Sequence, residues 1–94
     1  MQAVVIRVTI APDRWAEANT VLHDSVVPMT KSAPGFVRGT WLHNQDTATG
    51  TGFIMFETAE QARAMMSEME QAPPQPDDPV TITSVETFDV AAEA

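Results

Sequence analysis

Two histidines and two tryptophans are the side chains of this chain best suited to chemistry. Trp15, Asn19 and His23 are spaced four residues apart, which places them on one flank of a helix. A neutral histidine at the rim of a pocket can act as a general base near pH 7, and an asparagine amide can orient a carbonyl group or a water molecule. His23 and Asn19 are therefore the candidate catalytic residues. The competing interpretation leaves both side chains at the solvent edge of a buried helix face.

Trp41 and His43 share one side of a predicted strand, because side chains alternate along a strand. Together with Trp15 they are the candidate binding residues, since an aromatic-lined cavity suits a flat apolar ligand. In the competing interpretation the tryptophans fill the core. Arg38 lies on the opposite side from Trp41, and we expect it to form an ion pair with an acidic residue such as Glu57 or Glu86.

The composition predicts one globular domain spanning residues 1–94, with 44% apolar residues and a net charge of −8. A nucleic-acid surface needs clustered lysine and arginine, whereas the five basic residues of this chain are scattered. We therefore expect no nucleic-acid partner and no membrane partner. The chain has no cysteine, which excludes disulfides and thiolate chemistry, and its two histidines are twenty residues apart. We expect no metal and no other cofactor.

The predicted location is the cytoplasm. The first residues lack the basic region and long apolar stretch of a secretory signal peptide. No segment approaches the ~20 consecutive apolar residues that are needed to cross a bilayer. The absence of cysteine also fits a reducing compartment.

The elements that must position these residues follow from periodicity and from turn signals. Pro28 lies inside the first helical pattern and predicts a kink or break near residues 24–28. Thr58 and Gln61 form a capping box at the start of the second helix. A shift of apolar parity between Ile82 and Val85 indicates a β-bulge or a change of the layer that covers the strand. The predicted strands are 2–10, 36–44, 51–57 and 80–90, the helices are 13–32 and 59–71, and a proline-rich exposed connector covers 72–79.

The order strand, helix, strand, strand, helix, strand is that of a ferredoxin-like α+β fold. Right-handed crossovers place both helices on one face of an antiparallel sheet. The middle strands nevertheless have large apolar residues on both sides. In residues 36–44 we expect Phe36 and Leu42 on one side and Val37 and Trp41 on the other. In residues 51–57 we expect Ile54 and Phe56 on one side and Phe53 and Met55 on the other. Since no element remains to cover the second face, we expect a homodimer that packs sheet against sheet. The alternative is a patch that binds another protein.

Residues 27–29 (VPM) and 32–39 (SAPGFVRG) resemble the helix-to-strand passage of the antibiotic biosynthesis monooxygenase superfamily. Residues 53–62 (FIMFETAEQA) resemble the passage into its second helix, and the strand order and length match as well. The resemblance implies a homodimeric α+β barrel with a ligand cavity in each subunit between sheet and helices. Some members oxidise polycyclic aromatic substrates with O₂ and use neither metal nor flavin, whereas others degrade haem.

The resemblance implies a small-molecule-binding protein, similar to cofactor-independent monooxygenases that act on flat aromatic or quinone-like substrates. Haem-degrading relatives use a histidine on the second helix and an asparagine in the first strand. Residues 59–71 contain no histidine and residues 2–10 contain no asparagine, which argues against haem degradation. The alternative function is a non-enzymatic homodimeric structural or interaction module. A cavity of about 300 Å³ or more, walled by His23 or His43, would favour the binder, and a filled interior would favour the module.

Overall fold

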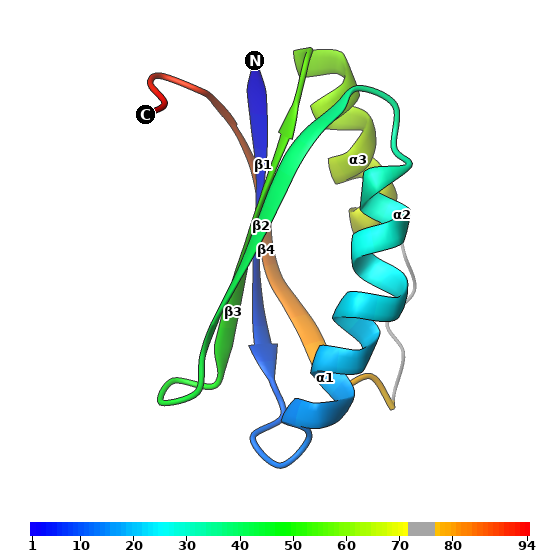
Figure 1. The fold of residues 1–94 in the computed structure, drawn as a ribbon, viewed down its shortest axis with the longest axis vertical. Helices are drawn as coiled ribbons and strands as arrows, with labels where there is room; N and C mark the ends of the chain where they lie inside the picture. Colours follow the sequence, from blue (N-terminus) through cyan, green and yellow to red (C-terminus); the bar gives the residue numbers. More distant parts are fainter. Residues whose placement is uncertain (72–76) are drawn as a thin grey trace.

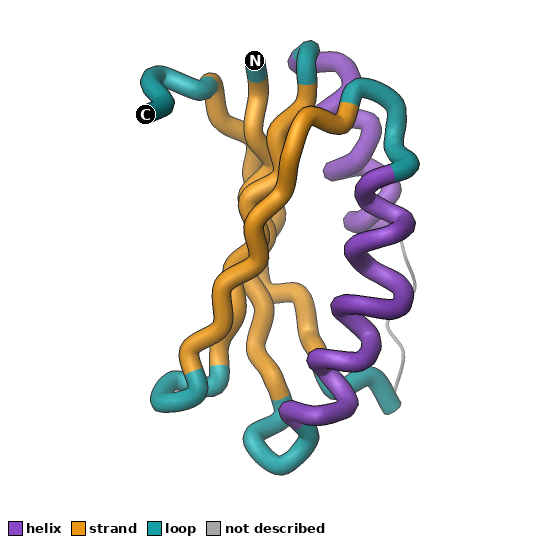
Figure 2. The backbone as a smooth tube through the Cα atoms, in the orientation of Figure 1, coloured by secondary structure: helices purple, strands orange, loops and turns teal. Residues whose placement is uncertain are grey.

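The computed structural model describes residues 1–71 and 77–94 and shows a four-stranded antiparallel sheet with its helices on one face (Figures 1 and 2). The sheet order is β2-β3-β1-β4, and the predicted α+β, ferredoxin-like order is confirmed. The predicted connector falls largely outside the described residues, although Pro79 at its end is buried rather than exposed. The elements are β1 (Gln2–Ile10), α1 (Trp15–Val21), η1 (Leu22–Val26), α2 (Val27–Lys31), β2 (Phe36–Asn44), β3 (Thr49–Phe56), α3 (Ala59–Gln71) and β4 (Val80–Asp89).

The central strand β1 pairs with β3 on one side and with β4 on the other. Its run of β-branched residues suits a pleated position between two neighbours. Val4, Ile54 and Phe56 of the sheet are fully buried. They pack against Ala62 and Met65 of α3 to form the core. The core therefore lies between α3 and one end of the sheet.

The first helix is continuous through Pro28 and contains a π-helical stretch where we predicted a kink or break. The backbone N–H of Val27 donates to the carbonyl of Leu22, five residues earlier. Proline has no N–H to donate to the preceding turn. Here the helix does not break, because the turn before Pro28 adopts the wider π-helical hydrogen-bond pattern. The segments α1, η1 and α2 therefore form one long rod along the sheet (Figure 1).

The capping box predicted at the start of α3 is confirmed. The Thr58 hydroxyl accepts a hydrogen bond from the N–H of Gln61, and the Gln61 side-chain oxygen accepts one from the N–H of Thr58, both at 3.2 Å. These contacts satisfy two N–H groups that the helix itself leaves free.

Two register shifts decide which side chains face the helices. In β4 the shift between the partners of Arg7 and Val8 leaves Thr83 as an extra residue, so of the two alternatives the bulge is confirmed. In β2 a shift between Phe36 and Arg38 leaves Val37 unpaired. The predicted division of β2 is therefore wrong. Phe36 is opposite Phe56 and lies on the helix side together with Trp41, because the extra residue resets the alternation.

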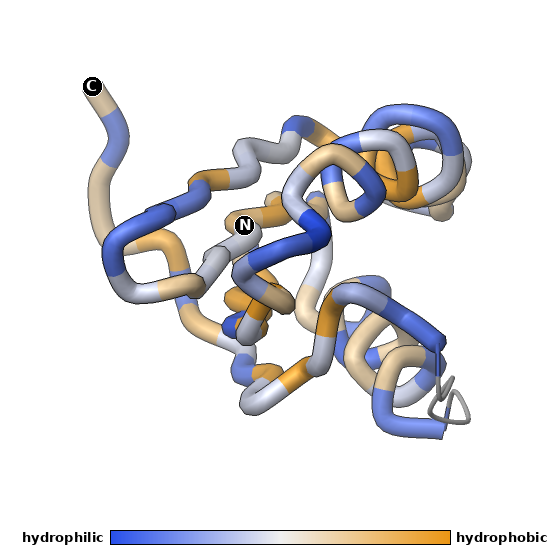
Figure 3. The backbone as a smooth tube through the Cα atoms, turned by 90° about the horizontal axis from the view of Figure 1, so that it is seen from below, coloured by the Kyte–Doolittle hydropathy of each residue, from blue (hydrophilic) through white to orange (hydrophobic). Residues whose placement is uncertain are grey.

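The face of the sheet away from the helices retains large apolar side chains. Leu42, Phe53 and Phe88 are 52%, 40% and 46% exposed, and Val5 lies between the strands that carry them. Hydrophobic stretches accordingly follow the strands as well as the helices (Figure 3). We refer to this side as the outer face.

The C-terminal segment crosses one end of the outer face. The N–H of Val90 donates to the carbonyl of Met1 beside β1, and Glu93 pairs with Arg38 of β2 at 2.5 Å. Figure 1 places the C-terminus on the side of the sheet opposite the helices. The expected ion pair of Arg38 with an acidic residue is confirmed, but its partner is Glu93 of the terminal segment and not Glu57 or Glu86, and Glu86 pairs with Arg7.

No helix in the described part of the chain is long and apolar enough to cross a membrane.

Candidate ligand cavity

A cavity of about 190 Å³ lies between the first helix and the helix-facing side of the sheet. It adjoins the core beneath α3, since Ile6 belongs to both, and its wall is mainly apolar. The residues around it are Ile6, Val8, Ala18, Val21, Leu22, Val26, Trp41, Leu42, His43, Gly50, Thr51, Gly52, Met69, Asp78, Val80 and Ile82.

Glycines on β3 help to leave this space open. Gly50 and Gly52 are on the helix side of the strand, where Ile54 and Phe56 fill the volume further along. Their partners on β2 are His43 and Trp41, respectively, which project into the space that the missing side chains leave. The sheet thus changes from a filled core to a hollow within one strand.

The helical wall of the cavity spans the junction of α1 and η1. Ala18 presents only a methyl group, and Leu22 and Val26 are provided by the π-helical stretch. An extra residue per turn alters the angle between successive side chains, so the π-helical stretch determines which of them face the sheet. Such stretches occur frequently at functional sites.

His43 is held at the wall by an aromatic contact with Trp15. The two ring centroids are 5.4 Å apart and the planes meet at 63°, an edge-to-face arrangement. Trp15 begins α1, so this contact joins the helix to the far end of β2. The contact restrains the imidazole at the cavity wall.

The ionisable side chains around the cavity are His43 and Asp78. Asp78 accepts a hydrogen bond at 2.9 Å from the N–H of Val80 and so caps the start of β4. Sequence reasoning missed Asp78, although an aspartate between a proline-rich segment and a strand is a turn signal. A ligand in this cavity would meet an imidazole and a carboxylate within a largely hydrocarbon wall.

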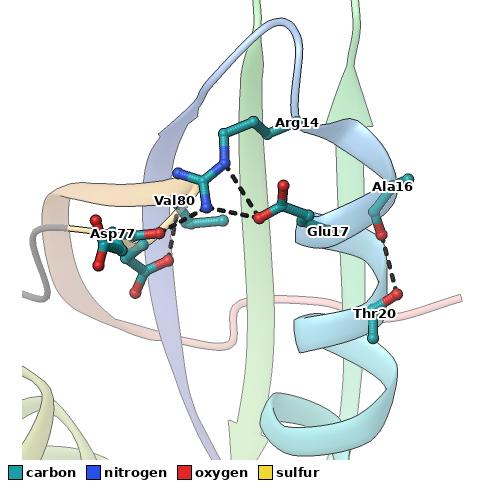
Figure 4. Close-up of polar contacts among 7 residues, drawn as sticks. Arg14, Ala16, Glu17, Thr20, Asp77 and Val80 are labelled. Carbon is teal, nitrogen blue, oxygen red and sulfur yellow. Dashed lines mark hydrogen bonds and ion pairs between the residues drawn. The ribbon is translucent and has the colours of Figure 1, made fainter.

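Arg14 joins two segments that lie beside the cavity, the start of α1 and residues 77–80. Its guanidinium donates to Glu17 at 2.6 Å and to the backbone carbonyl of Asp77 at 2.7 Å (Figure 4). The hydrogen bond from Arg14, with the charge attraction, lowers the pKa of Glu17, and the same contact raises the pKa of Arg14. Arg14 therefore ties the start of the first helix to the segment that presents Asp78 and Val80.

The structure brings part of the predicted site together. Trp41 and His43 line the cavity, and Trp15 contacts His43 from outside the lining. Asn19 and His23 are exposed on the first helix and do not belong to the lining formed by the described residues. Helical spacing placed both near one flank, but that flank faces solvent in the single chain. The roles of all five residues stay predictions.

Residues 1–71 and 77–94 contain no group of three or more histidine, aspartate or glutamate side chains placed to hold a metal ion.

Comparison with solved structures finds proteins of the same fold along nearly the whole chain. The heme degrader MhuD from Mycobacterium tuberculosis, solved with two hemes bound in its active site, is 13% identical, with a TM-score of 0.76. The match covers 100% of this chain and 99% of MhuD. SnoaB, a cofactor-independent oxygenase from Streptomyces nogalater, is 20% identical over 98% of this chain and 94% of its own, with a TM-score of 0.69.

A monooxygenase from the gene ActVA-Orf6 of Streptomyces coelicolor, solved in complex with nanaomycin D, is 14% identical. It is covered over 89% of its length and matches 99% of this chain, with a TM-score of 0.63. No family model and no curated protein matches the sequence. The chain therefore has the fold of these proteins, and the likeness is one of architecture.

Proposed function

We propose that this chain, which has the fold of cofactor-independent monooxygenases, binds flat aromatic or quinone-like molecules in the cavity under its first helix. The observation that supports the proposal is an apolar space with Trp41 and His43 in its wall. An enclosed apolar cavity of about 150 Å³ accommodates benzene. The cavity of about 190 Å³ thus suits one or two fused rings. This volume is smaller than the ~300 Å³ expected of a typical ligand pocket.

The reaction that fits such a site is oxidation of a phenolic ring by O₂. The phenol loses a proton, and the resulting carbanion-like ring transfers electrons to O₂. One oxygen atom enters the ring to give a quinone, and the other leaves as water. His43 is the proposed proton acceptor, and the apolar wall keeps the anion away from bulk water. Asn19 and His23 stay proposed as residues that assist from the helix, to be tested separately.

We further propose that the working form is a homodimer joined through the outer faces. Leu42, Phe53 and Phe88 give that face the apolar character that a partner sheet would cover. The neighbours of known activity, SnoaB and the ActVA-Orf6 monooxygenase, share the fold that this arrangement needs. Haem is a less suitable ligand, because α3 contains no histidine.

The second candidate is a dimeric module without catalytic activity, and the modest cavity volume favours it. Titration with 1,4-naphthoquinone by calorimetry, and O₂ uptake with 1-naphthol, separate the two. Saturable binding that His43→Gln weakens, together with O₂ uptake that the same variant abolishes, supports the oxygenase. Binding without O₂ uptake leaves a binding protein. Neither binding nor O₂ uptake contradicts the proposed function and supports the module.

A further inference from the structure

The indole ring of Trp41 lies across two glycines of the sheet. A Cβ atom added at Gly52 would be 3.0 Å from Cδ1 and 3.1 Å from Nε1 of the ring. A Cβ atom added at Gly39 would be 2.8 Å from Cη2 and 3.0 Å from Cζ3. The five-membered end of the indole thus occupies the side-chain space of one glycine, and the six-membered end occupies that of the other.

The two glycines lie on either side of Trp41 in the register. Gly52 is its direct partner on β3, and Gly39 precedes it by two residues on the same side of β2. Any other residue at either position would place a Cβ against the ring and tilt it away from the sheet. Glycine weakens a strand interior and often marks a close approach of this kind. Here the approaching group is the largest side chain of the cavity.

As a consequence, the indole ring of Trp41 gives the cavity one flat wall. A ring held along the sheet has its other side toward the cavity, where Ala18 and Leu22 of the first helix form the opposite wall. A cavity with a flat aromatic ring on one wall and small or aliphatic side chains on the other is expected to be narrow and flat, not spherical. Aromatic rings stack with an offset, and such contacts add about 0.5–1.5 kcal/mol beyond the burial of area.

We propose that Gly39 and Gly52 determine ligand specificity by holding Trp41 flat, so that the cavity prefers planar fused rings to globular apolar molecules of similar size. This inference rests on the proposed function in assuming that the cavity takes a ligand. It adds that the preference of the cavity for planar ligands depends on two glycines, which have no side chains of their own.

The experiment measures ring orientation and ligand preference separately. Ring orientation is followed by the near-ultraviolet circular dichroism of Trp41 in a Trp15→Phe background, where it is the sole indole. Preference is the ratio of dissociation constants for 1,4-naphthoquinone and for camphor, a planar and a globular bicyclic ketone, measured by calorimetry. The chain has no cysteine that the quinone could alkylate.

Gly52→Ala and Gly39→Ala are expected to change the indole band and to reduce the preference for naphthoquinone by about 2- to 12-fold, the loss of one stacking contact. Thr40→Ala is the matched control. Thr40 lies between Gly39 and Trp41 in β2 but pairs with Phe53 on the outer face, so the indole band stays as it is and the ratio changes less than twofold. Trp41→Leu keeps an apolar wall without the flat ring, and it should lose the preference even if the glycine variants fold poorly.

Three outcomes would overturn the inference. One is an unchanged indole band in Gly39→Ala and Gly52→Ala. Another is a parent protein that binds naphthoquinone and camphor equally well, a result that leaves the proposed binding function intact. The third is a preference that survives Trp41→Leu. Failure to bind either ketone would instead contradict the proposed function, and the specificity inference with it.

Discussion

Replacing Phe53 by alanine should dissociate the proposed homodimer. Phe53 lies on the outer face between Val5 and Thr40, and 40% of it is exposed in the single chain. A phenylalanine presents about 200 Å², so about 80 Å² would be covered in each copy, at about 25 cal/mol per Å². An alanine side chain still covers a little of that area, so the substitution should cost about 1.5–2 kcal/mol of dimerisation free energy per copy. The cost for the two copies together is then about 3–4 kcal/mol. The dimer dissociation constant should therefore rise about 100- to 1000-fold.

Sedimentation velocity over a range of concentrations measures this change. Met29→Ala is the matched control, because Met29 is 67% exposed on α2, on the helix side of the molecule, and its loss should leave the dissociation constant within about twofold. Phe88→Thr tests the same face with a β-branched residue suited to a strand, in case Phe53→Ala loses its fold. A parent protein that sediments as a monomer at micromolar concentration would refute the reasoning. Equal effects of the Phe53 and Met29 variants would also refute it.

Other predictions concern the stability of the chain. Phe56→Ala should lower the free energy of unfolding in urea by about 3–5 kcal/mol, since Phe56 is fully buried; a loss below 1 kcal/mol would contradict its place in the core. Thr58→Ala removes the acceptor for the N–H of Gln61 and should cost about 1 kcal/mol in the same assay, and an unchanged urea midpoint would argue against the capping box. The lowered pKa of Glu17 means that its pair with Arg14 stabilises the fold above the unfolded pKa of a glutamate and that this contribution is lost as the pH falls through the folded pKa. Glu17→Gln should therefore lower the urea midpoint at pH 7 and leave it nearly unchanged once the pH is below that folded pKa; equal losses at both pH values would exclude the ion pair as the cause.

Much of the fold follows from local sequence signals. Strand 2–10, strand 36–44 and helix 59–71 have the predicted bounds, because β-branched runs and a capping box are local in their effect. The bulge in the last strand was visible as a break in apolar parity at Ile82 and Val85. The bulge at Val37 was not visible, since apolar residues on both sides of that strand leave no parity to break.

The sequence by itself determined the order of the elements, the apolar excess on both sides of the sheet, and the pairing of Trp41 with His43 on one side of a strand. Only the tertiary structure decided which residues share a cavity. Asn19 and His23 were close to the buried flank by helical angle, but both side chains are exposed, because the packing of the helix against the sheet decides where the covered face ends. The role of Gly39 and Gly52 could be inferred only from the structure, because the indole ring of Trp41 fills the space that their side chains would occupy.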